Sequence, residues 1–147
     1  MTTDFNAYFQ SQVEGALSLA PQDRPFAQWR DTPAPGVLLL HGSAASPCNH
    51  RALARALFDQ GYQVYAPLLA GHEHLPSLHQ GHTSWVDCLR QALRDAEAFH
   101  AVCTHLHVLG SSFGGTLAYL MGVESPERFE TIMALSAPVI ADDGWSP

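Results

Sequence analysis

The sequence predicts an α/β fold with a mostly parallel β-sheet and helices on both of its faces. Apolar segments typical of strands alternate along the chain with amphipathic helical segments, which is the pattern of a parallel sheet. Residues 37–40 are a run of Val and Leu, as expected of a strand that is buried on both faces. A second, largely apolar run over residues 106–109 passes directly into Gly-x-Ser-x-Gly and then into a helical segment. These observations favour a sheet whose strands are joined by crossover helices.

The N-terminal part of the chain is less regular. Residues 5–19 carry apolar side chains at four-residue spacing, which predicts a helix that either packs on the domain or forms a loose leader. Residues 21–35 include four prolines and predict an extended connection with a short edge strand. We therefore expect a leader or helix over residues 1–24 and part of a single α/β domain over residues 25–147.

The elements expected after this connection follow the alternating pattern. They are a strand over 36–40, a helix over 49–60, a strand over 63–66, a helix from Thr83 or Ser84 to Ala101, a strand over 106–111, a helix from Phe113 to Gly122 and a strand over 131–135. Gly61 is placed to end the first of these helices, and Pro67 stops the strand that follows it.

The Gly-x-Ser-x-Gly segment predicts a nucleophile elbow, a sharp turn from strand to helix that exposes a serine. Gly110 and Gly114 lack the Cβ atoms that would clash in such a turn, so that Ser112 can adopt a strained backbone conformation with its hydroxyl exposed. Ser111 lacks this glycine spacing. The helix that begins near Phe113 directs its positive end at the reacting centre. The alternative is a glycine-rich turn in which the serine has no catalytic task.

The end of the first apolar strand predicts the second part of such a site. His41, Gly42 and Ser43 follow the strand, and the glycine allows the next backbone amides to turn inward. Serine hydrolases bind the oxyanion with one amide from such a loop and one from the residue after the nucleophile. The candidates are the amides of Ser43 and Phe113. We expect His41 to pack and brace the loop, because a general base must face the nucleophile from another loop.

Six stretches share their order and spacing with one known family. They are Val37–Gly42, Gly61–Pro67, Leu69–His72, Trp85–Asp87, Gly110–Gly115 and Leu135–Pro138. Through them the chain resembles the α/β-hydrolases, and among these the small bacterial carboxylesterases and monoacylglycerol lipases, from roughly Pro25 onward. The resemblance implies hydrolysis of a small-molecule carboxylic ester through an acyl-enzyme on Ser112, without a cofactor. Ser43 stands where those esterases usually have a bulky residue, which would alter the acyl pocket but not the amide.

The resemblance also implies a triad acid after the seventh strand and a histidine after the eighth. With roughly 30 residues for each strand–helix–strand step, they should follow Ser112 by about 60 and about 90 residues, whereas 35 residues remain. The strand over 131–135 would be the sixth. We therefore expect the N-terminal portion of a longer hydrolase, truncated after the sixth strand and inactive by itself. The alternatives are another acyl hydrolase, such as a thioesterase or serine peptidase, and a non-catalytic binding module with this scaffold.

Composition limits the other classes of function. The net charge is −7 and no Lys or Arg run occurs, which argues against nucleic acid as a partner. No stretch is long enough to span a bilayer and no signal peptide is visible, so a cytoplasmic setting is the default expectation. Cys48, Cys88 and Cys103 show neither a disulfide framework nor zinc-ligand spacing. The sequence does not predict an oligomeric state.

Histidines and aspartates elsewhere could suggest a metal site or a triad acid. The histidines of the loop over 71–82 are His72, His74, His79 and His82. Since no Asp or Cys completes a familiar ligand set, we expect exposed loop histidines and no metal. Asp142 and Asp143 follow the strand over 131–135, one strand too early for the usual acid, and we expect a solvated loop there.

Overall fold

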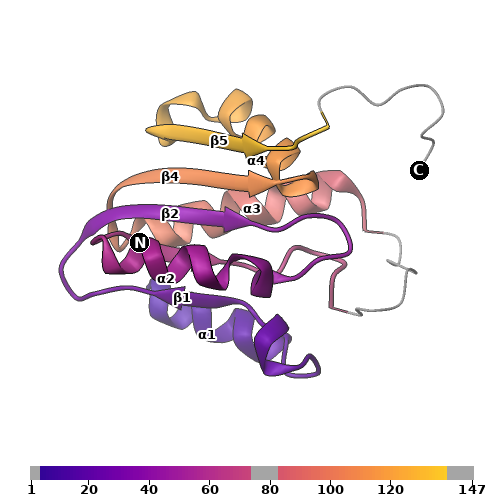
Figure 1. The fold of residues 1–147 in the computed structure, drawn as a ribbon, viewed down its shortest axis with the longest axis horizontal. Helices are drawn as coiled ribbons and strands as arrows, with labels where there is room; N and C mark the ends of the chain where they lie inside the picture. Colours follow the sequence, from indigo (N-terminus) through magenta and orange to yellow (C-terminus); the bar gives the residue numbers. More distant parts are fainter. Residues whose placement is uncertain (1–3, 74–82, 139–147) are drawn as a thin grey trace.

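The computed structural model describes residues 4–73 and 83–138 (Figure 1). Its helices are α1 (Phe5–Gly15), α2 (Arg51–Asp59), α3 (Trp85–His100) and α4 (Phe113–Glu124), with 3-10 turns at Pro21–Asp23, Pro47–His50 and Pro126–Arg128. Its strands are β1 (Phe26–Gln28), β2 (Ala34–Leu40), β3 (Gln63–Ala66), β4 (Cys103–Ser111) and β5 (Thr131–Leu135). The expected alternation of strands and helices is confirmed.

The five strands of the described part form one sheet in the order β1-β3-β2-β4-β5. Only β1 runs antiparallel to its neighbour, so the sheet is mostly parallel, as predicted. Strand β5 corresponds to the strand over 131–135 that the resemblance counts as the sixth. In the described part of the chain it is the fifth strand and lies at the edge of the sheet. Leu40 of β2 pairs with Gly110 of β4, so the loops that follow these two strands begin side by side.

Helices cover both faces of the sheet (Figure 1). Along β2, Leu38 and Leu40 belong to the core beneath α1, α3 and α4, whereas Val37 and Leu39 belong to the core beneath α2. This split follows from the strand geometry, in which successive side chains point to opposite faces. The continuous Val and Leu run of β2 is therefore explained by burial on both sides.

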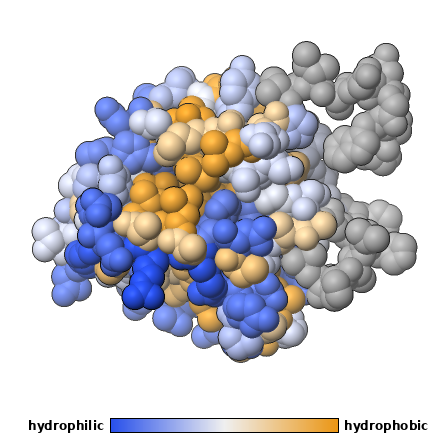
Figure 2. All heavy atoms as spheres, viewed as in Figure 1, coloured by the Kyte–Doolittle hydropathy of each residue, from blue (hydrophilic) through white to orange (hydrophobic). Residues whose placement is uncertain are grey.

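The face beneath α2 is incompletely covered. Figure 2 shows apolar side chains gathered on this side of the molecule. They surround a hollow of about 410 Å³ lined by Val37, Leu53, Leu57, Tyr62, His107, Leu109, Thr131 and Met133. Ile132 and Leu135 of β5 are also exposed. The edge of the sheet at β5 thus presents apolar surface and unpaired strand backbone within the described part of the chain.

Helix α1 packs on the domain and is not a loose leader. Phe5 is 2% exposed, and its ring centroid lies 5.1 Å from that of Trp29 and 5.1 Å from that of Phe99. The side chain of Asp4 caps the helix by accepting from the amide of Asn6 at 3.0 Å. The helix ends at Gly15, earlier than the expected residue 19, because the chain turns there. In the ranges that the structure describes, no helix combines the length and apolar character needed to cross a membrane.

Candidate active site at the nucleophile elbow

Ser112 occupies the turn between β4 and α4 with the backbone conformation expected of an elbow. Its φ is 52° and its ψ is −123°, a region that residues other than glycine rarely adopt. The side chain is exposed and does not cap the helix, so its hydroxyl is not occupied by the backbone of α4. Strand β5 holds the backbone of Ser112, because the amide of Ser112 donates to the carbonyl of Leu135 at 2.8 Å.

The two glycines of the elbow are required by close backbone contacts. A Cβ on Gly110 would overlap the carbonyl of Gly114, and a Cβ on Gly114 would overlap the carbonyls of Leu40 and His41. The start of α4 therefore lies directly against the end of β2. This contact is the structural reason for the Gly-x-Ser-x-Gly spacing.

The structure brings the predicted oxyanion loop next to Ser112. A Cβ on Gly42 would lie 3.2 Å from the Cβ of Ser112 and 3.8 Å from its Oγ. Ser43 follows directly and is exposed. Ala44 has a φ of 52°, which turns the loop back, and the amide of Ala45 donates to the carbonyl of Gly42 at 3.3 Å. The loop is therefore a tight turn that starts beside the serine.

Amides remain available on both sides of Ser112. Within residues 4–73 and 83–138, the amides of Ser43 and Phe113 donate to no carbonyl or side chain. Phe113 is the first residue of α4, where backbone N–H groups have no partner inside the helix. These unpaired donors and the helix dipole favour negative charge near the serine.

His41 braces this loop. Its ring is completely buried, Nε2 accepts from the amide of Leu69 at 3.0 Å, and Nδ1 lies 2.9 Å from the carbonyl of Gly42. The amide of Leu69 can only donate, so the proton must be on Nδ1, which donates to Gly42. Burial lowers the pKa of His41 to about 3. A neutral imidazole with both nitrogens occupied is a support for the loop, as the sequence predicts, and not its general base.

His72 corrects the prediction of exposed loop histidines. It is 3% exposed, and its ring centroid lies 4.8 Å from that of His41. The amide of His72 donates to the carbonyl of Leu69 at 3.1 Å, and this turn places the ring against that of His41. His74, His79, His82, Asp142 and Asp143 lie outside the described residues. Among the described residues, no three His, Cys, Asp or Glu side chains are placed to hold a metal ion.

Sequence reasoning missed the supports that reach the elbow from β5. Besides the carbonyl of Leu135, the carbonyl of Pro138 accepts from Oγ1 of Thr116 at 2.9 Å, which ties α4 to the segment after β5. Ser136 between them has a φ of 51°. The acceptors are backbone carbonyls, so no residue type marks them. One sequence signal could have found them. The strand expected over 131–135 should pair with the strand that precedes Ser112, and such pairing places the end of the later strand beside the elbow.

The amino-acid sequence matches the family described as "Serine aminopeptidase, S33" over residues 31–145. The chain belongs to this family of α/β-hydrolases. A curated relative, the thermostable monoacylglycerol lipase of Bacillus sp. (strain H-257), is 32% identical over 93 residues, which are 63% of this chain and 36% of that protein.

Solved structures agree with this assignment. A structure described under "LipS and LipT, two metagenome-derived lipolytic enzymes" has a TM-score of 0.67 and 29% identity, covering 76% of this chain and 44% of that chain. The monoacylglycerol lipase of Paleococcus ferrophilus has a TM-score of 0.63 at 21% identity, covering 82% and 47%, which is a likeness in fold. The chain spans less than half the length of each of these three proteins.

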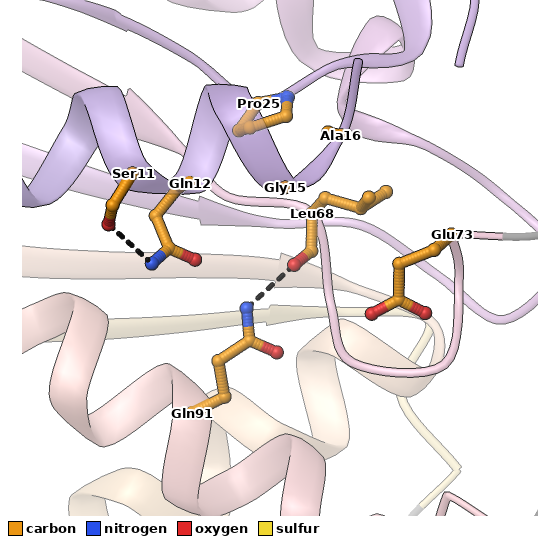
Figure 3. Close-up of a pocket in the computed structure, with 8 residues that line it drawn as sticks. All are labelled: Ser11, Gln12, Gly15, Ala16, Pro25, Leu68, Glu73 and Gln91. Atoms are coloured by element: carbon orange, nitrogen blue, oxygen red, sulfur yellow. Dashed lines mark hydrogen bonds between the residues drawn. The ribbon is translucent and has the colours of Figure 1, made fainter. Parts of the chain in front are cut away.

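A second hollow of this α/β-hydrolase family member, of about 260 Å³, lies between α1 and the loop after β3 (Figure 3). Its lining residues are Ser11, Gln12, Gly15, Ala16, Pro25, Leu68, Glu73 and Gln91. The side-chain Nε2 of Gln91 donates to the backbone carbonyl of Leu68 at 2.7 Å across it. None of these residues belongs to the elbow or to the oxyanion loop.

Replacement of Gly114 tests the backbone contact at the elbow. Gly114→Ala should lower the free energy of unfolding by about 2 kcal/mol or more, because the new Cβ meets backbone carbonyls that cannot rotate away. Gly15→Ala is the matched control, since a Cβ there has no neighbour within 4 Å. Urea unfolding measures both variants. Equal stability of the Gly114→Ala and wild-type proteins would contradict the contact.

The buried histidine predicts a dependence of stability on pH. The pKa of folded His41 is below its unfolded value of 6.5, so its neutral form stabilises the fold above pH 6.5, and this contribution is lost as the pH falls below 6.5. The advantage of wild type over His41→Gln in unfolding free energy should therefore shrink by up to about 1.4 kcal/mol per pH unit between pH 6.5 and 4.5. A difference between the two proteins that stays constant over this range would show that His41 is not buried as a neutral ring.

Proposed function

We propose that Ser112 is the nucleophile of a carboxylic ester hydrolase that works through an acyl-enzyme. The observation that carries the proposal is the position of Ser112, exposed at a positive φ against Gly42 of the neighbouring loop. Membership in the α/β-hydrolases and similarity to lipolytic proteins support ester hydrolysis as the reaction. The substrate would be a small-molecule ester.

The proposed reaction has two acyl transfers. Oγ of Ser112 attacks the acyl carbon while a histidine takes its proton, and the carbonyl oxygen becomes an oxyanion. The amides of Ser43 and Phe113 donate to this oxyanion. Collapse of the tetrahedral intermediate breaks the bond to the alcohol, which leaves with the proton from the histidine. A water molecule then attacks the acyl-enzyme by the same steps and releases the acid.

The histidine and the acid of the triad are proposed to lie beyond residue 147. The proposal is supported by the short coverage of the relatives, of which the chain spans 36% to 47%, and by the tightly bonded, neutral state of His41. Without these two groups the serine keeps a high pKa and is a poor nucleophile. The 147-residue chain alone should therefore turn over little or no ester.

Another acyl hydrolase is the second candidate. The family description names a serine aminopeptidase, and the same elbow and oxyanion loop could serve amide or thioester cleavage. A panel of p-nitrophenyl esters, acyl thioesters and aminoacyl amides would separate these reactions. A binding module without catalysis is disfavoured by the strained Ser112, because binding alone does not require that conformation.

The nucleophile is tested with a fluorophosphonate probe. In the protein that carries the complete triad, the probe should label Ser112, because the elbow exposes its hydroxyl beside unpaired amides. Ser112→Ala should abolish labelling, as read by intact-protein mass spectrometry, whereas the neighbouring control Ser111→Ala should retain it. Labelling of the Ser112→Ala protein would refute the assignment. Robust ester turnover by the isolated 147-residue chain would instead refute the proposed location of the histidine and acid.

The oxyanion loop is tested by removing one amide. Ser43→Pro deletes the backbone N–H and should reduce kcat by on the order of 10²-fold or more, the usual effect of losing one oxyanion donor. Ser43→Ala keeps the amide and should change kcat little. If both variants lost activity equally, the hydroxyl of Ser43 and not its amide would be the active group.

A further inference from the structure

A buried carboxyl group connects α1 to the rest of the protein. Asp95 of α3 is completely buried. The hydroxyl groups of Tyr8, from α1, and Tyr65, from β3, both donate to its Oδ1, each at 2.9 Å. Its Oδ2 is buried and has no hydrogen-bond partner in the described part of the chain. Three elements therefore meet at one carboxyl oxygen, while the second oxygen is left unsatisfied.

The surroundings of this carboxyl group are apolar. Phe5, Phe9 and Phe99 pack around the Tyr65 ring with centroids between 5.3 and 6.0 Å away. The titratable groups that face Asp95 are Tyr8 on α1 and Tyr65 on β3, and the nearby charge is that of Arg94, an exposed residue of α3 itself. Within the described residues, no ion pair to Asp95 compensates a buried negative charge.

We propose that Asp95 is a protonation switch for the docking of α1: the carboxyl group takes up a proton when α1 is packed over it and releases the proton when α1 leaves. The switch is independent of the chemistry at Ser112. It acts on the N-terminal helix, whose attachment combines the buried Phe5 with the hydrogen bond from Tyr8.

Burial provides the energetic basis of the switch. It raises the pKa of Asp95 to about 7, and the opposing effects of the hydrogen bonds from Tyr65 and Tyr8 and of the Arg94 charge do not cancel it. Burial also raises the pKa of both tyrosines, so their hydroxyl groups remain donors at neutral pH. Removal of α1 would expose the carboxyl group and take away the donor Tyr8, so the pKa of Asp95 should fall from about 7 toward the ordinary aspartate value of 3.8. In the pH range between the two pKa values, docked α1 therefore favours the protonated carboxyl.

The direction of the effect follows from this difference in proton uptake. Docking of α1 is strongest in acid, weakens as the pH rises from 4 toward 7, and changes little above that range. The ratio of undocked to docked protein should increase over this interval by at most on the order of 10³-fold, the limit reached if the undocked carboxyl has the ordinary aspartate pKa. Undocking would also remove the wall that α1 contributes to the hollow beside Leu68 and Glu73 (Figure 3).

Native-state hydrogen exchange measures this ratio. Exchange of the α1 amides, corrected for the intrinsic rate at each pH, would be followed between pH 5 and 8 with the amides of β4 as the reference. The α1 opening constant should rise by 10-fold or more over this interval in wild type. It should be nearly independent of pH in Asp95→Asn. The matched control Glu97→Gln, which removes an exposed carboxylate from the same helix, should behave as wild type.

A pH-independent α1 in wild type, or an unchanged dependence in Asp95→Asn, would overturn the proposal. If Asp95→Asn does not fold, the ¹³C resonance of the Asp95 carboxyl group in wild type decides the question. It should titrate near neutral pH, and Tyr8→Phe should move the midpoint upward, because one donor to the charged form is lost. A midpoint near 4 would overturn the proposal.

Discussion

The structure depends on one contact between backbones, where the first turn of α4 lies against the end of β2. The carbonyls of Leu40 and His41 occupy the space that a side chain at position 114 would need. The same approach sets Gly42 against Ser112. Because the two segments touch through glycine, the serine and the loop of proposed oxyanion donors lie at a fixed distance, without a flexible side chain between them.

This contact imposes a strained conformation on Ser112, and the surrounding structure stabilises it. The carbonyl of Leu135 holds the amide of Ser112 from the side of β5, and His41 joins the oxyanion loop to the loop that follows β3. Strain of this kind persists only where neighbouring interactions determine the backbone. The elbow is thus supported from the segments that follow β5 and β3. Within the described part of the chain β5 is an edge strand, so this edge of the sheet is close to the proposed chemistry.

The sequence predicted those parts of the fold that local patterns encode. The Val and Leu run of β2 indicates a strand that is buried on both faces. The glycine spacing around Ser112 indicates a sharp turn. His72 was misjudged, because a polar loop predicts exposure while a turn at Leu69 buries the ring. Asp95 was not recognised, because its partner Tyr8 lies 87 positions away and no local pattern marks a buried carboxyl group. The roles of Ser43 and Phe113 remain predictions that the geometry supports.

The most direct test of this account is an NMR measurement of the elbow in the 147-residue chain. The account predicts a nuclear Overhauser effect between the α protons of Gly42 and the β protons of Ser112, together with coupling constants that give Ser112 a positive φ. A negative φ at Ser112, or the absence of this contact in a folded chain whose β2–β4 pairing is observed, would contradict the proposal that the fold holds a strained nucleophile beside its oxyanion loop.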